Sequence, residues 1–130
     1  IEPEVLSRVN VNPKYIQVVK EGMLAVTKPG GTAASTFKGL PFNVGAKTGT
    51  AQTGRKAENA LLVGFAPYEN PQLVFVVLAP DSLRSGTSSS DATGPIARRL
   101  LEAYNEMYPG VLTPAANTAS QQQPTQAEQQ

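Results

Sequence analysis

The chain has 130 residues, about the size of one domain, and its eleven basic and ten acidic residues leave a net charge of +1. Such a balance gives no basic stripe of the kind that binds a nucleic-acid backbone. Because cysteine and histidine are both absent, disulfide bonds, thiolate or imidazole metal ligands and imidazole acid-base chemistry are excluded. The chain contains no apolar run of the ~18 residues of a membrane span. Because it opens on Ile1 without an initiator methionine, we expect a piece of a longer protein.

The first part of the chain predicts an extended lead-in over residues 1–11 and then one long helix. Asn12 can cap this helix and Pro13 suits its first position. Apolar side chains then recur at helical spacing, at Tyr15, Val19, Met23 and Val26. We expect an amphipathic helix that packs on the core, ends before Pro29 and tolerates Gly22 because another backbone packs close to it. A single helical turn is expected over residues 32–35.

Three strand-like runs follow, at residues 44–52, 59–66 and 72–79, and short turns separate them. Short connections imply that neighbouring strands are antiparallel, as in a meander. The third run is apolar on both faces, with Val74, Val76 and Leu78 on one face and apolar side chains at 73, 75 and 77 on the other. This pattern is typical of a strand in the middle of a sheet whose two faces are both covered.

The last part of the chain predicts a loop over residues 80–90 and a final helix to Tyr108. Because proline is tolerated in the first turn of a helix, Pro95 indicates that this helix begins at Asp91 or at Gly94. The order helix, three-strand antiparallel meander, helix makes the fold class α+β. We expect residues 1–110 to form the folded unit and residues 111–130, rich in Gln, Ala, Thr and Pro, to be a disordered tail.

The run at residues 44–52 carries a cation, hydroxyls and glycines where a structural strand would carry hydrophobic side chains. Alternation along a strand sends Lys47 and Thr48 to opposite faces, so both can serve one ligand only if it lies along the strand edge. Gly49 leaves room for that approach. The alternatives are structural: a lysine protects an edge strand from aggregation, and Thr50 has good strand propensity.

A phosphate-binding loop is excluded by its spacing requirements. That motif needs Gly directly before Lys, a second Gly five positions earlier and a helix afterwards. Here Ala46 precedes Lys47, and another strand follows.

Residues 47–52, with Gly45 and Ala46 before them, resemble the K-T-G motif of the penicillin-binding protein transpeptidases. The sequences 22–23, 31–33 and 64–67 agree with the same family. Over residues 9–108 the chain resembles the C-terminal part of the transpeptidase domain of a class B penicillin-binding protein of the elongation or sporulation type. The resemblance implies an incomplete part of the five-stranded transpeptidase and β-lactamase-like fold.

The resemblance also implies roles for individual residues. Lys47 and Thr50 would be catalytic, and Lys47, Thr48, Gly49 and Thr50 would bind the substrate. The Lys47 ammonium and Thr48 hydroxyl would favour the ligand carboxylate, and the Thr50 backbone N–H would be an oxyanion donor. Substrates would be peptidoglycan stem peptides ending in D-Ala-D-Ala, with β-lactams as their mimics. No metal or organic cofactor is implied, and the parent protein would be held in the cell membrane through its N-terminal region, with this part on the extracytoplasmic face.

Residues 35–38 spell S-x-x-K, the nucleophile motif of the same enzymes. In those enzymes a helix places the serine and the lysine on one face, but here Gly39 and Pro41 follow at once. We interpret this match as coincidence, and the S-x-N motif of the family is also missing. The acylating serine would therefore lie outside this chain, and the chain alone would be inactive. A non-catalytic structural or partner-binding module with a vestigial site remains the alternative.

The apolar third strand carries one more expectation. The second strand can occupy only one of its two edges, and an open edge on a long apolar strand is an aggregation hazard. We expect a strand from the upstream part of the same domain, or else from a second copy of this chain, to fill the other edge.

Overall fold

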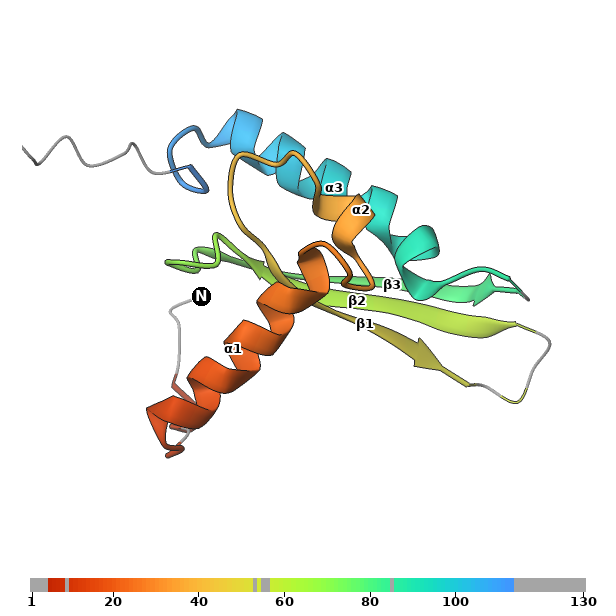
Figure 1. The fold of residues 1–130 in the computed structure, drawn as a ribbon, viewed down its shortest axis with the longest axis horizontal. Helices are drawn as coiled ribbons and strands as arrows, with labels where there is room; N and C mark the ends of the chain where they lie inside the picture. The colour runs from red at the N-terminus through yellow and green to blue at the C-terminus, as the bar shows by residue number, and fades with distance from the viewer. Residues whose placement is uncertain (1–4, 9, 53, 55–56, 85, 114–130) are drawn as a thin grey trace, which may run out of the picture.

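The computed structural model describes residues 5–8, 10–52, 54, 57–84 and 86–113. Its helices are α1 (Pro13–Thr27), α2 (Ala34–Phe37) and α3 (Ser89–Met107), and its strands are β1 (Gly45–Ala51), β2 (Glu58–Ala66) and β3 (Leu73–Leu83). The strands form one antiparallel sheet in the order β1-β2-β3. The predicted α+β meander with a helix before it and a helix after it is confirmed (Figure 1).

Helix α1 begins where the sequence predicts, but it does not pack as expected. The Asn12 side chain accepts a hydrogen bond of 3.0 Å from the Lys14 N–H, and Pro13 occupies the first helical position. No residue of α1 is buried within the described part of the chain, and a Cβ added to Gly22 would meet nothing within 4 Å. Figure 1 shows why: α1 meets the sheet at its C-terminal end, and its N-terminal part projects away from the sheet.

Helix α2 lies two residues later than predicted and is one turn long. Lys38 follows it with φ −57° and ψ 129°, which is outside helical geometry. Ser35 therefore stands on a helix that ends before Lys38. The coincidence interpretation of residues 35–38 is consistent with this break.

The sheet register assigns side chains to two faces. Ala46 lies opposite Gly64, and Gly64 lies opposite Phe75, so these residues share one face. Helix α3 covers that face (Figure 1). The resulting core consists of Ala33, Phe37, Val44, Ala46, Leu62, Ala66, Phe75, Val77, Ala97, Leu101 and Leu112.

Strand β3 is longer than predicted and stands at the edge of this sheet, not in the middle. It continues to Leu83 through Pro80, so the predicted loop over residues 80–90 is wrong in its first part. Proline is tolerated there because β3 has a neighbour on one side only within the described chain, and because its pairing with β2 shifts register between Glu58 and Ala60. The face of β3 away from α3 is open, with Val74 75% and Val76 63% exposed.

Helix α3 begins earlier than the sequence predicts, at Ser89. Ser88 caps it: its hydroxyl accepts from the Asp91 N–H at 3.2 Å, and the Asp91 carboxylate accepts from the Ser88 N–H at 3.0 Å. This capping box fixes the start of the helix, so Pro95 lies in the second turn and not in the first.

The core extends past the expected boundary at residue 110. Leu112 is completely buried and Val111 packs against the core, so the packed part includes both residues. The rest of the expected tail, residues 114–130, lies outside the described residues.

Candidate functional site

Strand β1 is the other outer strand of the sheet, and its exposure changes sharply along its length. Ala46 is completely buried and Val44, just before the strand, is 2% exposed. From Lys47 onward the side chains are exposed or half-buried. The strand is therefore anchored in the core at its beginning, and its polar residues follow on an accessible edge.

Hydrogen bonds from two other segments secure the beginning of β1. The Thr27 hydroxyl, at the end of α1, donates to the Val44 carbonyl oxygen at 2.7 Å. Asn43 accepts from the Lys28 ammonium at 2.5 Å and donates to Glu69 at 2.6 Å. These contacts tie α1 and the turn after β2 to the entrance of β1.

Lys47 and Gly49 share the face of β1 that α3 does not cover. Lys47 lies opposite Val63 of β2, and its ammonium group donates to the Thr48 carbonyl oxygen at 2.6 Å. A Cβ added to Gly49 would lie 3.5 Å from the Leu61 Cβ, which is an ordinary contact. With no side chain at Gly49, no Cβ stands between its backbone and a ligand on this face, and the sheet does not itself require a glycine there.

Thr48 and Thr50 lie on the face that α3 covers, and each hydroxyl pairs with a hydroxyl from another element. Thr48 Oγ1 lies 3.1 Å from Thr32 Oγ1, which belongs to the turn before α2. Thr50 Oγ1 lies 2.7 Å from Ser89 Oγ, at the start of α3. The expected site residues thus lie together on one strand, and two residues not singled out from the sequence support their hydroxyls.

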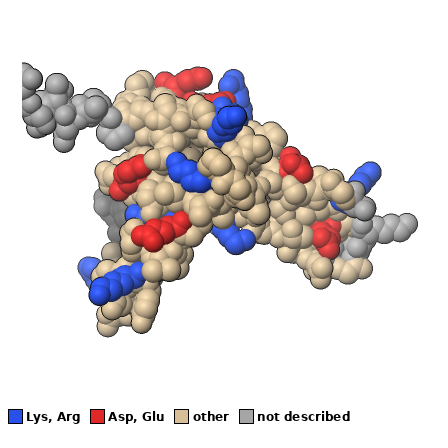
Figure 2. Space-filling model, viewed as in Figure 1, with Lys and Arg blue, Asp and Glu red and all other residues tan. Residues whose placement is uncertain are grey.

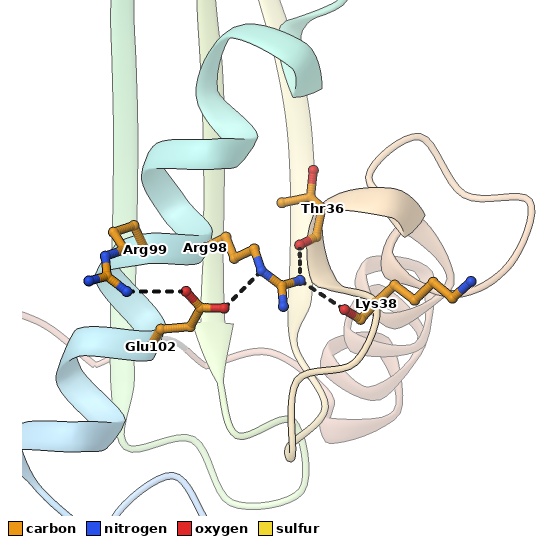
Figure 3. Close-up of polar contacts among 5 residues, drawn as sticks. All are labelled: Thr36, Lys38, Arg98, Arg99 and Glu102. Atoms are coloured by element: carbon orange, nitrogen blue, oxygen red, sulfur yellow. Dashed lines mark hydrogen bonds and ion pairs between the residues drawn. The ribbon is translucent and has the colours of Figure 1, made fainter.

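Arg98 connects α3, on which it lies, to the end of α2. Its Nη1 donates to the carbonyl oxygens of Thr36 at 2.9 Å and Lys38 at 2.8 Å, at the end of α2 (Figure 3). Its Nε forms an ion pair of 2.8 Å with Glu102, one turn further along α3. This clamp fixes the end of α2 against α3.

The helix cap at the N-terminus of α3 favours the charged form of Asp91. Hydrogen bonds from the Ser88 hydroxyl, and secondarily from the Ser88 backbone N–H, hold the pKa of the Asp91 carboxyl below its ordinary value of 3.8. Asp91 is therefore a carboxylate at neutral pH and remains an acceptor for both groups.

A metal site, a basic surface and a membrane-spanning helix are the other features to consider in the described part of the chain. No three of its acidic residues form a group that could hold a metal ion. Figure 2 shows basic and acidic side chains interspersed on the visible face, without a basic stripe. Among the described helices, none has the length and apolar character needed to cross a membrane.

Sequence reasoning missed Thr32 and Ser89 because their contacts link residues far apart in the chain. Thr32 is 16 residues from Thr48, and Ser89 is 39 residues from Thr50. A serine at the start of a helix signals capping, and the sequence 88–90 offers three candidates for that role. A helix needs one capping serine, so the two further serines in the sequence 88–90 were the signal that one of them has another role.

Comparisons with known proteins agree with the K-T-G resemblance. A family model described as the penicillin binding protein transpeptidase domain matches residues 1–102. Penicillin-binding protein 2A of Bacillus subtilis is 32% identical over 117 residues, which cover 82% of this chain and 16% of that protein. Peptidoglycan D,D-transpeptidase MrdA of Escherichia coli is 31% identical over 109 residues, which cover 72% of this chain and 16% of that protein.

A solved structure shows the same fold. PBP2 of Pseudomonas aeruginosa superposes with a TM-score of 0.71 and 28% identity, over 88% of this chain and 25% of that one. The present chain thus spans about a sixth of the length of these curated relatives. The resemblance to the transpeptidase domain of class B penicillin-binding proteins is confirmed. Because the family model matches well over half of its residues, the chain belongs to the penicillin-binding protein transpeptidase domain family.

Proposed function

We propose that this chain supplies the ligand-binding edge strand of a serine D,D-transpeptidase, which cross-links peptidoglycan stem peptides. The observation that carries the proposal is the construction of β1. Its beginning is buried at Val44 and Ala46, and its exposed part carries residues 47–50 along an outer edge of the sheet. An extended peptide, or a β-lactam that mimics its D-Ala-D-Ala end, can add to such an edge through backbone hydrogen bonds.

The residues of β1 take separate roles in this proposal. The Lys47 ammonium and the Thr48 hydroxyl favour the ligand carboxylate from the two sides of the strand, and Gly49 leaves the backbone accessible between them. The Thr50 backbone N–H donates to the oxyanion that develops when the ligand carbonyl is attacked. The register supports these separate roles: β1 pairs with β2 without a bulge, so the consecutive residues Lys47 and Thr48 lie on opposite faces of the sheet.

The acylating serine belongs to a region outside this chain in the same proposal. Ser35 is exposed, and the four-residue helix that carries it ends before Lys38. A serine needs an adjacent base to become a nucleophile, and Lys38 lies outside the helical geometry that would place it on the same face as Ser35. We therefore propose that the parent protein is the enzyme and that the chain alone is inactive.

The open side of the sheet supports the idea that the parent contributes more of this domain. Strand β3 has one described neighbour, and its outward face exposes Val74, Val76 and Leu78. We propose that an upstream strand of the same domain pairs with this edge. The alternative is that a strand from a second copy of the chain pairs with it. The parent would be held in the cell membrane, with this domain on the extracytoplasmic side where peptidoglycan lies.

Two substitutions at one position test the edge-binding role in the parent protein. Gly49→Ala adds one carbon at an ordinary contact distance, whereas Gly49→Val adds a branched side chain beside the ligand path. We expect the rate of labelling by a fluorescent penicillin to fall far more for valine than for alanine, with both variants folded. Equal labelling of the wild-type protein and both variants would contradict binding along this edge. A wild-type parent that is not labelled at all would favour the vestigial module.

A further inference from the structure

The hydroxyl pair between Thr50 and Ser89 links the exposed end of β1 to the beginning of α3. The two oxygens lie 2.7 Å apart although the residues are 39 positions apart in the chain. Ser89 is 6% exposed, whereas Thr50 is exposed. The contact therefore joins a buried hydroxyl to a residue on the accessible edge.

The Ser89 hydroxyl is not needed to cap the helix. Ser88 and Asp91 already satisfy the first turn through their reciprocal hydrogen bonds. Ser90 also takes part in this cluster, because its hydroxyl lies 2.9 Å from the Ser88 hydroxyl. Of the three consecutive serines, Ser89 is the one whose side chain turns toward β1.

Ser89 is held firmly enough to orient a partner. Its carbonyl oxygen accepts a hydrogen bond of 2.6 Å from the hydroxyl of Thr93, which is completely buried. Further along α3, Ala97 and Leu101 are also completely buried in the core. The Ser89 hydroxyl is thus carried by a helix that packs firmly in the core. A residue that orients a functional group needs such a rigid support.

Thr50, by contrast, lies near the end of its strand. Ala51 is the last residue of β1, and it is exposed. Thr50 pairs with Ala60 across the sheet, and an alanine side chain offers little packing to fix the threonine. The bond to Ser89 is therefore the polar contact that holds the Thr50 side chain in one orientation among the described residues.

We infer that Ser89 is a positioning residue that acts through Thr50. This inference rests on the proposed function, in which the Thr50 backbone N–H stabilises the oxyanion. Fixing the Thr50 hydroxyl restrains the torsion about its Cα–Cβ bond and with it the end of β1. Because an oxyanion donor contributes most when it is already aligned before charge develops, loss of this restraint should slow acylation more than it weakens ligand binding.

The test compares two neighbouring serines in the full-length parent protein, with benzylpenicillin as the probe. Ser89→Ala removes the contact to Thr50, and Ser90→Ala is the matched control that removes a hydroxyl from the same helical turn. We expect Ser89→Ala to lower the maximal acylation rate constant about tenfold, a fraction of the ~100-fold or larger loss that follows removal of a whole oxyanion donor. The ligand concentration at half-maximal rate should change less than twofold, and Ser90→Ala should change neither quantity by more than twofold.

A second background separates positioning from a general effect on the helix. In Thr50→Val the hydroxyl bond is already absent, so adding Ser89→Ala should cause no further decrease in the acylation rate constant. An equal tenfold decrease in both backgrounds would show that Ser89 acts through α3 alone and would overturn the inference. A Ser89→Ala protein that is acylated as fast as Ser90→Ala would overturn it as well, while leaving the proposed function intact. A wild-type parent that is never acylated would overturn both.

Discussion

The ammonium nitrogen of Lys47 lies 2.6 Å from the carbonyl oxygen of Thr48, so the cation is held beside its own strand. The position places a positive charge at the outer edge of β1, beside the backbone that we propose as the binding surface.

Replacement of Lys47 tests whether this charge is used. We expect Lys47→Ala to lower the acylation rate of the parent protein by about tenfold to a hundredfold, because a hydrogen bond to a charged group contributes ~1.5–3 kcal/mol. The free energy of unfolding should change by less than ~0.5 kcal/mol, since the side chain is exposed. Stopped-flow acylation and urea unfolding measure the two quantities.

Lys38→Ala is the control for that experiment. Lys38 is also exposed, and Figure 3 shows its ammonium group pointing away from the Arg98 contacts. Its removal should leave acylation unchanged. If both substitutions slowed acylation equally, Lys47 would act only through the overall positive charge of the protein and not through its position on β1.

A pair of glycine substitutions tests the packing of the sheet and of α1. A Cβ at Gly64 would lie 2.5 Å from the Phe75 ring and 2.7 Å from the Gly45 carbonyl oxygen, so Gly64→Ala should destabilise the chain by about 1–3 kcal/mol. Gly22→Ala should stabilise it by about 0.5–1 kcal/mol, because its Cβ enters open space within a helix. Urea unfolding of the chain measures both, and destabilisation by Gly22→Ala would show that α1 packs against something close to that position.

The Asp91 carboxylate makes the start of α3 sensitive to acid. Because hydrogen bonds from Ser88 lower its pKa in the folded state, its contribution to stability is complete above the unfolded value near 3.8 and is lost as the pH falls through the lower folded value. Thermal unfolding followed from neutral pH to well below the ordinary Asp pKa of 3.8 should show this loss. Asp91→Asn should be less stable at neutral pH and should lose less stability on acidification, and identical acid profiles would contradict this account of the cap.

The outer edge of β3 provides a test of what the parent adds to the sheet. In this chain alone, amides on that edge should exchange with solvent rapidly, whereas the amides of β2, which is paired on both sides, should exchange slowly. In the parent protein the β3 edge amides should become protected as well. Rapid exchange of the same amides in the parent would show that no strand fills this edge and that β3 ends the sheet.

Local signals in the sequence predicted most of the elements correctly. Asn12 and Pro13 marked the start of α1, and the alternation of residues 59–66 predicted β2 to within one residue. The errors came from contacts that no local pattern contains. Pro80 looked like the end of a strand, but an edge position with a register shift tolerates it. Pro95 looked like a first-turn residue, but the capping box of Ser88 and Asp91 begins the helix earlier.

In the candidate site, too, the sequence revealed the local features but not the contacts between distant residues. The run of residues 47–50 was visible because cations and glycines are unusual in a strand, and the structure places it on an outer edge as predicted. The supporting hydroxyls of Thr32 and Ser89 depend on how α2 and α3 pack against β1, and this packing depends on side chains spread along the chain, including Arg98.

Intact-mass spectrometry after incubation with benzylpenicillin tests most directly whether this chain supplies a binding edge to a nucleophile located elsewhere. The parent protein should gain the mass of one penicilloyl group, and the 130-residue chain alone should gain none. Ser35→Ala in the parent should leave the adduct unchanged. A stoichiometric adduct on the isolated chain that disappears in Ser35→Ala would contradict the account, because it would identify residues 35–38 as a working S-x-x-K motif.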